Sequence, residues 1–321
     1  MIWISWERHR RTRELSRALG AELCEFTSDL GRLFKYPVLL LRSTLLVARR
    51  RPSVLVVQCP SVILAVWAGL VKRAFGFTLV ADLHNEAVTP FIQSFPLYRR
   101  LLLWIHRRAD LCLVSNAALK TVVENAGGTA LVLPDRLPQL KMGAKVPRSR
   151  SPLVVFVCTY APDEPYLEVI EAARTFGPGI QLHVTGNFHH AGRPLDPPSS
   201  VRLTGFLSEE QYVGLLQAAD VIVDLTSMED CLVCGAYEAA ALGKPLVTSD
   251  TAALRRYFTR GTVYTAHDVP SLVSAIRYAI EHRDRLASEM HILKQELSVT
   301  WAQQMASVRT ALGVEKAVVN Q

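Results

Sequence analysis

Short apolar runs alternate with amphipathic stretches along the whole sequence, and this alternation is the strongest constraint on its fold. Runs such as Val54–Val57 and Leu111–Val114 contain only apolar residues, as expected of strands covered on both faces of a sheet. Stretches such as Ser61–Phe75 have the length and composition of helices. Strands that alternate with helices form parallel βαβ units. The sequence therefore predicts an α/β protein with doubly wound parallel sheets, in which ligands lie at the carboxyl ends of the strands.

The alternation is interrupted in one region. Pro134–Pro152 contains four prolines, five basic residues and no apolar periodicity, and a second alternating region follows it. A chain of 321 residues is also long enough for two domains of roughly 150 residues each. We therefore expect an N-terminal domain at residues 1–140, a linker at 141–152 and a C-terminal domain at 153–297.

The two halves of the chain differ in charge. Residues 1–150 contain 23 Lys and Arg against 10 Asp and Glu, a balance of +13, whereas residues 151–321 contain 13 against 19, a balance of −6. A basic half is typical of proteins that bind nucleic acid, an anionic membrane or a phosphorylated ligand. Charge alone does not choose among these three partners. Half of the residues are apolar, which excludes bulk disorder.

Cysteine usage and the N-terminus indicate the compartment. Six cysteines are scattered through the sequence, mostly in apolar runs, which is typical of reduced thiols rather than of a secreted disulfide framework. Met1–Trp6 is too short for the apolar core of a signal peptide. No apolar run approaches the ~20 residues that span a bilayer. We expect a cytoplasmic protein whose membrane contact is peripheral, at the inner face.

The densest polar motif lies in Ala219–Val247, where a buried strand, a polar turn, a helix of small residues and a Gly-Lys-Pro turn follow one another. The N–H groups at the start of that helix suit a diphosphate. Glu238, eight residues after Asp230, is placed to accept hydrogen bonds from two vicinal ribose hydroxyls. The alternative is that Asp230 only caps the helix and that Glu238 is a solvated helix residue.

This motif resembles the donor-binding signature of retaining GT-B glycosyltransferases of the Glu-x7-Glu, glycosyltransferase family 4-like type. The sequence has Asp230-x7-Glu238 followed by Gly243-Lys244-Pro245. The resemblance implies that Glu238 binds the ribose and that Asp230, or the adjacent Glu229, lies near the donor sugar. It also implies two Rossmann-like domains with parallel sheets facing a cleft, and a C-terminal helix at residues 298–321 that packs back on the N-terminal domain.

Other segments resemble chitobiosyl-diphospho-dolichol β-mannosyltransferases, which invert configuration and use GDP-mannose with a lipid-diphosphate acceptor. The segments are Val57–Ser61, Leu79–Asn85 and Thr159–Glu164. The glycine-rich loop and the Arg and Lys pair of the retaining enzymes are absent, so retention and inversion both stay open. The donor-binding residues expected from the two resemblances are Thr159, Asp163, Glu164, Glu229, Cys234 and Glu238.

His84 directly follows an apolar strand, at the end where α/β sites form. In retaining relatives a His at this point contacts the transferred sugar. In an inverting reaction His84, Glu86 or Asp82 is the candidate general base toward the acceptor hydroxyl. The catalytic residues expected are His84, Glu86 and Asp230. The alternative for His84 is an ordinary hydrogen-bonded loop residue.

Basic residues gather in two places in the N-terminal half. Arg8, His9, Arg10 and Arg11 open the first helix and are the expected acceptor-binding residues, because a helix N-terminus with added positive charge suits a phosphate. The alternative is a solvated helix face. A second run, Arg32–Arg51, mixes apolar and basic residues as helices at a membrane interface do.

The function expected is metal-independent transfer of a hexose, with mannose favoured, from a nucleoside-diphosphate sugar to a hydroxyl of a glycan or polyprenyl-phosphate-linked acceptor. The expected donor is GDP-mannose or a UDP-sugar, used as a co-substrate, and no cofactor is expected. An anionic membrane surface is a further expected partner, and nucleic acid is not. The alternatives are a GT-B enzyme that is not a transferase, such as a sugar-nucleotide epimerase, and a nucleic-acid-binding protein.

Overall fold

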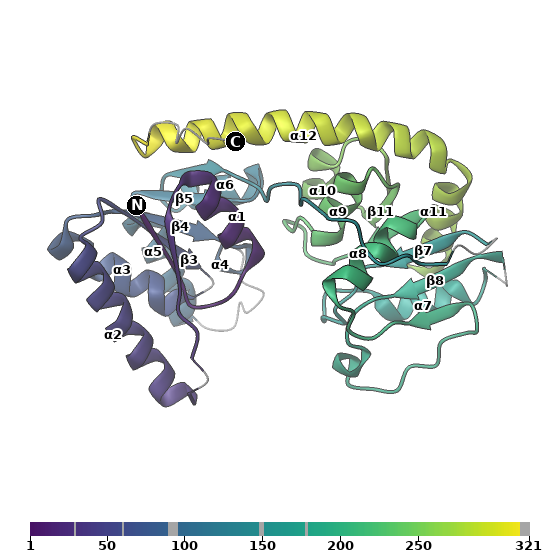
Figure 1. The fold of residues 1–321 in the computed structure, drawn as a ribbon, viewed down its shortest axis with the longest axis horizontal. Helices are drawn as coiled ribbons and strands as arrows, with labels where there is room; N and C mark the ends of the chain where they lie inside the picture. The colour runs from purple at the N-terminus through teal and green to yellow at the C-terminus, as the bar shows by residue number, and fades with distance from the viewer. Residues whose placement is uncertain (29, 60, 89–95, 148–150, 177–178, 315–321) are drawn as a thin grey trace. The chain divides into compact units, whose positions relative to one another are not determined.

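The computed structural model describes residues 1–28, 30–59, 61–88, 96–147, 151–176 and 179–314, without the side chains at positions 32, 33 and 86. The chain divides into two compact units. The first comprises Met1–Arg136 together with the C-terminal residues from Thr300 onward, and the second comprises Leu137–Val299. Each unit contains its own six-stranded sheet (Figure 1).

The strands of the first unit are all parallel and lie in the order β2-β1-β3-β4-β5-β6. The order changes direction between β1 and β3, and ligand sites of doubly wound sheets form at such a point. The elements are β1 (Ile2–Ser5), α1 (Arg10–Leu19), β2 (Glu22–Glu25), α2 (Arg32–Arg50), β3 (Val54–Cys59), α3 (Val62–Phe75), β4 (Thr78–Leu83), α4 (Asn85–Val88), α5 (Pro96–Arg108), β5 (Leu111–Val114), α6 (Ala117–Asn125) and β6 (Ala130–Val132).

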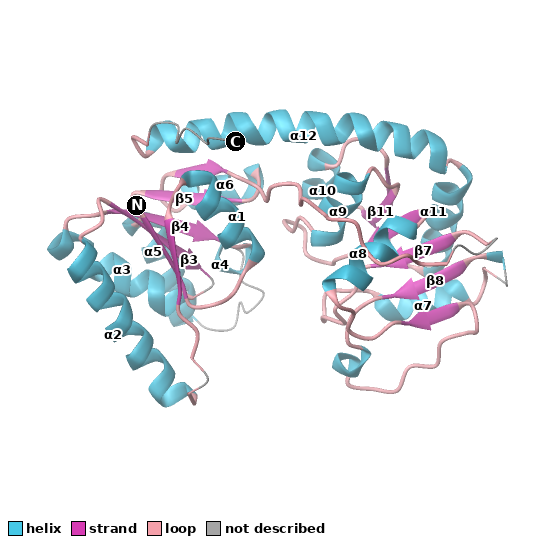
Figure 2. Cartoon of the chain, in the orientation of Figure 1, coloured by secondary structure: helices cyan, strands magenta, loops and turns pink. Residues whose placement is uncertain are grey.

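Helices cover both faces of this sheet (Figure 2). Alternate residues of β3 belong to different cores, because successive side chains of a strand point to opposite faces. Leu55 and Val57 pack with α2, α3, α5 and α6, whereas Val56 packs with α1 and with the last helix of the chain, α12 (Arg283–Ala311). The expectation of strands buried on both faces is confirmed.

The last turns of α12 complete the core of the first unit. Met305 and Val308 are buried there against residues of β1, β3 and α1. The indole N–H of Trp301 donates to the carbonyl oxygen of Pro134 at 3.1 Å, and the Arg136 guanidinium lies over the Trp301 ring. The division into units therefore places the residues after Thr300 with the N-terminal sheet.

The second unit has strand order β12-β11-β10-β7-β8-β9, again all parallel. This is the order of a Rossmann sheet, and it changes direction between β7 and β10. The elements are β7 (Leu153–Phe156), α7 (Tyr166–Ala173), β8 (Gln181–Val184), η2 (Phe188–Ala191), β9 (Val201–Leu203), α8 (Glu209–Ala218), β10 (Val221–Asp224), α9 (Cys234–Leu242), β11 (Leu246–Ser249), α10 (Ala252–Tyr257), β12 (Thr262–Thr265), α11 (Val269–Glu281) and the first part of α12.

The segment expected to be a linker is instead packed onto the second unit where it is described. The Gly143 N–H donates to the side-chain oxygen of Gln217 at 3.0 Å, and the Ala144 N–H donates to the carbonyl of Glu210 at 2.9 Å. Both acceptors belong to α8, so this stretch lies against that helix. The prolines and basic residues of this segment leave it without apolar periodicity, but its backbone N–H groups still form hydrogen bonds to α8.

No helix in the described ranges combines the length and the apolar character needed to cross a membrane.

Gly214 of α8 tests this packing. A Cβ atom at Gly214 would lie 2.0 Å from the carbonyl oxygen of Ala144. On an exposed helix face Gly→Ala stabilises the protein by up to about 1 kcal/mol. Here the added methyl group would overpack the contact with Ala144, so the substitution is expected to destabilise the protein. We expect Gly214→Ala to lower the free energy of unfolding by about 1–3 kcal/mol in urea denaturation.

Gly31→Ala is the control, because no atom lies within 4 Å of the added Cβ there. Equal stability of Gly214→Ala and the wild type would contradict the packing of the 143–144 segment on α8.

Candidate functional site

The loop after β7 lies at the point where the sheet of the second unit changes direction, and the Glu164 carboxylate closes it. This carboxylate accepts the N–H of Thr159 at 2.8 Å, the N–H of Ala161 at 2.9 Å and the hydroxyl of Thr159 at 3.0 Å. The backbone between them turns sharply at Tyr160, whose φ is 62°, a left-handed conformation that is uncommon for a bulky residue. Glu164 therefore holds the loop in which the expected donor-binding Thr159 lies.

Asp163 links this loop to the loop that follows β10. Its carboxylate accepts the Thr226 hydroxyl at 2.5 Å, and its carbonyl oxygen accepts the Ser227 N–H at 2.8 Å. The two loops on either side of the switch point are therefore tied together through one expected donor-binding residue. Asp163 reaches that position because β7 and β10 are neighbours in the sheet.

Asp224, the last residue of β10, caps the helix that follows. Its carboxylate is buried and accepts the N–H of Gly235 in the first turn of α9 at 2.5 Å. Val233 at the N-cap has no side-chain acceptor, so Asp224 satisfies an N–H group that a capping Ser or Asp ordinarily serves. Asp230 is not the N-cap of α9, and the alternative that it caps the helix is wrong.

Burial raises the pKa of Asp224 well above its ordinary value, although the Gly235 N–H opposes the rise. The neighbouring carboxylates of Glu164, Glu238 and Asp163 raise the pKa further, because like charges disfavour ionisation. The carboxyl edge of β7 and β10 is therefore crowded with acids, and Asp224 among them favours its neutral form. Sequence inspection missed Asp224, which looks like the end of an apolar strand.

Glu238 lies on the buried side of α9 and is 7% exposed. The hydroxyl of Tyr212, from α8, donates to its carboxylate at 2.5 Å. Burial raises the pKa of Tyr212 well above its ordinary value, and the Glu238 carboxylate raises it further. The alternative that Glu238 is a solvated helix residue is therefore wrong. Sequence inspection did not identify Tyr212, because its role depends on the packing of α8 against α9.

The remaining residues expected at the donor site lie around the start of α9. Glu229 is exposed, Asp230 is half-buried, and Cys234 is the exposed first residue of the helix. They share a short segment with Asp224 and Glu238 along the chain. Among the described residues, no group of three or more His, Cys, Asp or Glu side chains is arranged to hold a metal ion. The donor assignments stay predictions.

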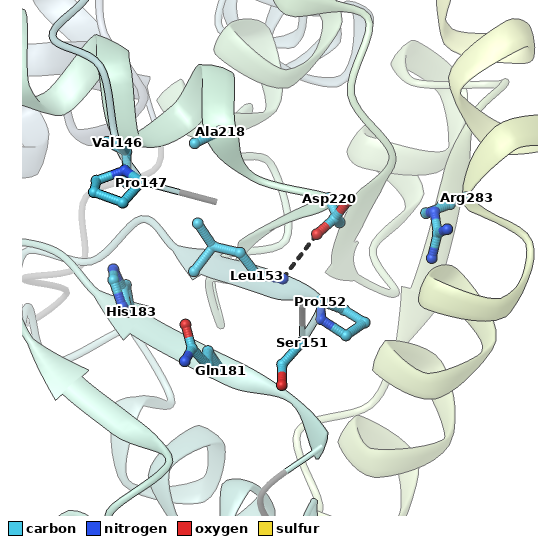
Figure 3. Close-up of a pocket in the computed structure, with 10 residues that line it drawn as sticks. All are labelled: Val146, Pro147, Ser151, Pro152, Leu153, Gln181, His183, Ala218, Asp220 and Arg283. Atoms are coloured by element: carbon cyan, nitrogen blue, oxygen red, sulfur yellow. Dashed lines mark hydrogen bonds between the residues drawn. The ribbon is translucent and has the colours of Figure 1, made fainter. Parts of the chain in front are cut away.

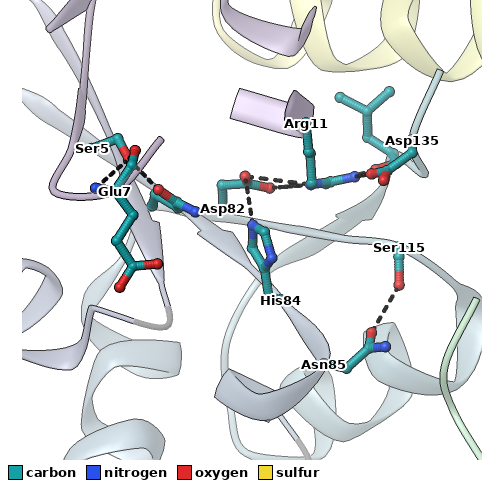
Figure 4. Close-up of polar contacts among 10 residues, drawn as sticks. Ser5, Glu7, Arg11, Asp82, His84, Asn85, Ser115 and Asp135 are labelled. Carbon is teal, nitrogen blue, oxygen red and sulfur yellow. Dashed lines mark hydrogen bonds and ion pairs between the residues drawn. The ribbon is translucent and has the colours of Figure 1, made fainter. Parts of the chain in front are cut away.

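The first unit contains a buried ion-pair network centred on Arg11 (Figure 4). Its guanidinium donates to Asp82 at 2.8 Å, to Asp135 at 2.6 Å and to the carbonyl oxygen of Leu133 at 2.8 Å. The side chain of Arg11 is 4% exposed and that of Asp82 is fully buried. The contacts join α1 to the end of β4 and to the segment after β6. Arg11 is thus engaged inside the protein, which differs from the expected contact with an acceptor phosphate.

The network also determines the charge of Asp82. Burial alone would raise the pKa of Asp82, but the Arg11 guanidinium and His84 more than offset this and hold the pKa well below its usual range. Burial alone would likewise lower the pKa of Arg11, and Asp82 and Asp135 raise it instead. A carboxylate held ionised in this way is a poor general base, so Asp82 does not fit that role.

His84 lies beside this network, after the end of β4. Its Nε2 lies 3.6 Å from the Asp82 carboxylate, and its ring meets the ring of His9 edge-on at 4.6 Å between centroids. Its backbone N–H donates to the carbonyl of Cys59 at the end of β3. The following residue, Asn85, accepts a hydrogen bond from the Ser115 hydroxyl at 3.2 Å (Figure 4).

Burial lowers the pKa of His9, and the nearby His84 lowers it further. Within the described part of the chain, neither His9 Nδ1 nor His84 Nε2 has a hydrogen-bond partner. The two imidazoles therefore lie together at the carboxyl edge of the sheet, with His84 Nε2 facing the Asp82 carboxylate at 3.6 Å. Buried polar atoms of this kind usually bind water or a ligand.

The other residues expected near this edge are distributed differently. Arg8 is exposed, and Arg10 forms an exposed ion pair with Glu14 at 3.1 Å, one turn along α1. Glu86 belongs to α4, and its side chain lies outside the described residues. The structure therefore brings His9, Arg11 and His84 together and leaves Arg8 and Arg10 at the surface.

A small pocket of about 150 Å³ lies at the opposite edge of the second sheet (Figure 3). Its lining includes residues at the start of strands, such as Leu153 and Gln181, and it includes none of the residues expected to bind the donor. Asp220 in this pocket accepts the N–H of Leu153 at 2.8 Å. Since ligands of doubly wound sheets bind at the carboxyl ends, this pocket is not the candidate site.

Two doubly wound parallel sheets in one chain are the architecture of the GT-B fold, and solved structures with this fold match almost the whole chain. Sucrose-phosphate synthase from Thermosynechococcus elongatus matches with a TM-score of 0.76 and 15% identity, over 98% of this chain and 99% of the synthase. Anabaena HepE in complex with UDP-glucose matches with a TM-score of 0.71 and 15% identity, over 96% of this chain and 91% of HepE. At this level of identity the likeness shows the fold.

The sequence itself matches one family model. Residues 166–307 match the family described as "Glycosyl transferase-like". No curated protein sequence matches the chain significantly. The chain thus has the GT-B fold, and the region that matches the glycosyltransferase family model contains helices α8 and α9. The predicted fold class and the predicted enzyme class, glycosyltransferase, are confirmed.

Removal of Arg11 tests the network of the first unit. Arg11→Met leaves the buried Asp82 without its main counter-charge, and we expect the free energy of unfolding to fall by about 3–5 kcal/mol in urea denaturation at pH 7. Arg10→Met is the matched control, because Arg10 lies next to it in an exposed pair and is expected to change stability by less than about 1 kcal/mol.

The pH dependence adds a check on this result. Because the folded pKa of Asp82 lies below its unfolded value of about 3.9, the ionised carboxylate stabilises the fold above that pH, and the contribution is lost as the pH falls further. The difference between wild type and Arg11→Met is therefore expected to shrink below about pH 4. A difference independent of pH would contradict this account.

Proposed function

We propose that the chain transfers a hexose from a nucleoside-diphosphate sugar to the hydroxyl of an acceptor. In this proposal the second unit binds the donor and the first unit binds the acceptor. The observation that carries it is the buried Glu238, held by Tyr212 within the family-matched region, at the switch point of a Rossmann-ordered sheet. A carboxylate at this place suits the two hydroxyls of a ribose.

The diphosphate would lie at the start of α9 and against the loops after β7 and β10. Those loops are joined through Asp163 and closed by Glu164, so their backbone is held in position before a ligand arrives. The N–H groups of Thr159 and Ala161 already donate to Glu164 and the surrounding side chains are acidic, so we infer that the dipole at the start of α9, rather than basic side chains, receives the phosphates. Mannose stays the favoured sugar, from GDP-mannose or a UDP-sugar, and HepE binds UDP-glucose.

His84 is the proposed catalytic residue of the first unit. In an inverting reaction its imidazole takes the proton of the acceptor hydroxyl, the acceptor oxygen forms a bond to C1 of the sugar, and the bond from C1 to the diphosphate breaks. The ionised Asp82 at 3.6 Å stabilises the imidazolium that forms. In a retaining reaction the same imidazole contacts the transferred sugar. Asp230 and Glu229 would lie near that sugar.

The acceptor proposed is a glycan or a polyprenyl-phosphate-linked saccharide. Arg8, Arg10 and His9 lie at the start of α1, where a phosphate gains from both the helix dipole and the added positive charge. The basic balance of the N-terminal half supports an anionic acceptor.

Donor binding is tested by thermal unfolding of the protein with UDP, GDP, ADP or dTDP. We expect at least one nucleotide to raise the Tm, since a ligand at about 100 times its Kd stabilises the fold by about 2.7 kcal/mol. Glu238→Gln keeps an acceptor for the Tyr212 hydroxyl but removes the negative charge, and it is expected to lower the nucleotide affinity at least tenfold. Glu209→Gln, on the exposed start of α8, is the control. If no nucleotide raises the Tm, the proposed function is refuted.

Catalysis is tested in an assay with a radiolabelled sugar nucleotide that stabilises the protein. His84→Ala is expected to reduce the transfer rate by at least about 100-fold, as the loss of a general base does, while the nucleotide-induced Tm shift is retained. His282→Ala removes a half-buried His at the C-cap of α11, in the other unit, and is expected to leave transfer unchanged. Near-normal turnover by His84→Ala would remove His84 from the mechanism.

A further inference from the structure

Helix α2 carries apolar residues on two opposite faces. The inward face is formed by Leu39, Ser43 and Val47, which recur every fourth residue and are completely buried. These residues pack the helix into the first unit, and the Ser43 hydroxyl accepts the indole N–H of Trp6 at 3.1 Å. One apolar face is sufficient to hold a surface helix against a core. The apolar residues of the other face therefore need a separate explanation.

The outward face is a stripe of four large apolar side chains, which we call the α2 stripe. Phe34, Val38, Leu41 and Leu45 are 69%, 37%, 59% and 44% exposed. Their spacing of four, three and four residues places them along one line of the helix. Single exposed apolar residues are ordinary on protein surfaces, whereas a continuous line of them indicates an interaction surface.

Positive charge lies beside the α2 stripe. The helix contains Arg32, Lys35, Arg42, Arg49 and Arg50 and has no acidic residue. Lys35, Arg42 and Arg49 follow one another at intervals of seven, so they line a single flank next to the stripe. An apolar line with a basic flank is the pattern of helices that lie in the headgroup region of a membrane. A second copy of the same helix is disfavoured, because pairing two α2 stripes would bring basic flanks together.

Within the first unit, α2 lies at the edge, beside α3 (Figure 2). Pro37, Val38 and Leu41 of the helix are exposed, together with Leu30 just before it. The stripe is therefore open to solvent along most of the length of the helix, and a flat surface can approach it.

We propose that the α2 stripe docks the first unit on an anionic lipid bilayer, with Phe34 and Leu41 inserted among the acyl chains and with Lys35, Arg42 and Arg49 near the headgroup phosphates. This inference deepens the proposed function, on which it rests, by naming the surface where a lipid-linked acceptor is met. Its geometry comes from α2 alone and does not involve the donor residues.

The test is sedimentation of the full chain with phosphatidylcholine vesicles, with and without 30% phosphatidylglycerol, at 0.1 M salt. Wild-type protein is expected to bind the anionic vesicles at least tenfold more tightly than the neutral ones. Phe34→Gln with Leu41→Gln is expected to weaken binding to the anionic vesicles at least tenfold. Lys35→Gln with Arg49→Gln is expected to reduce the preference for anionic vesicles by about 30-fold, at roughly 1 kcal/mol for each of the two basic residues near the surface.

The matched control is Ile292→Gln with Val299→Gln, which removes two exposed apolar residues from α12 and is expected to leave vesicle binding unchanged. Circular dichroism and the Tm of each variant establish that it is folded. Absence of wild-type binding to anionic vesicles, or unchanged binding by Phe34→Gln with Leu41→Gln, overturns the inference. A dimer that forms through Phe34 and Leu41 in place of vesicle binding also overturns the inference.

The nucleotide-induced Tm shift separates this inference from the proposed function. We expect Phe34→Gln with Leu41→Gln to keep the shift of the wild type, because the donor residues lie in the other unit. Vesicle binding without any nucleotide shift would uphold the membrane surface and refute the transferase.

Discussion

Both sheets are parallel and buried on both faces, and this constraint decides where polar chemistry can lie. Helices occupy the two faces of each sheet, so side chains in the middle of strands such as β3 and β10 pack in hydrophobic cores. Polar groups are admitted at the strand ends, where loops and helix N-termini supply hydrogen bonds. The Arg11 network lies at the carboxyl ends of β4 and β6, and the Glu238 cluster lies near the carboxyl end of β10, where the strand order of its sheet changes direction.

The two polar clusters favour opposite protonation states of a buried aspartate. In the first unit the positive charge of Arg11 stabilises the ionised form of the Asp82 carboxylate. In the second unit Asp224 has acidic neighbours, and burial favours its neutral form. A fixed negative charge beside His84 is suited to stabilising a proton on the imidazole. Acidic side chains suit the hydroxyls of a ribose, and the dipole at a helix N-terminus suits a diphosphate.

The alternation of strands and helices was sufficient to predict the fold, because buried parallel strands are apolar along their whole length. The strand Thr262–Thr265 was missed, since it lies at the edge of its sheet and half of its residues are polar. Motif spacing identified Glu238 but not its partner Tyr212, which comes from a different helix. The sequence could not show that Arg11 is buried while Arg8 and Arg10 beside it are exposed. The carboxylates that bind Arg11 are distant from it along the chain.

Helix α12 contributes to the cores of both units, with Met290 and Leu293 in the second and Met305 and Val308 in the first. The N-terminal sheet is synthesised before the second unit, yet one of its faces lacks those last two residues until translation has passed Val308. The core of the first unit can therefore close only after the second unit has been made. Completed folding of the first unit thus depends on synthesis of the second.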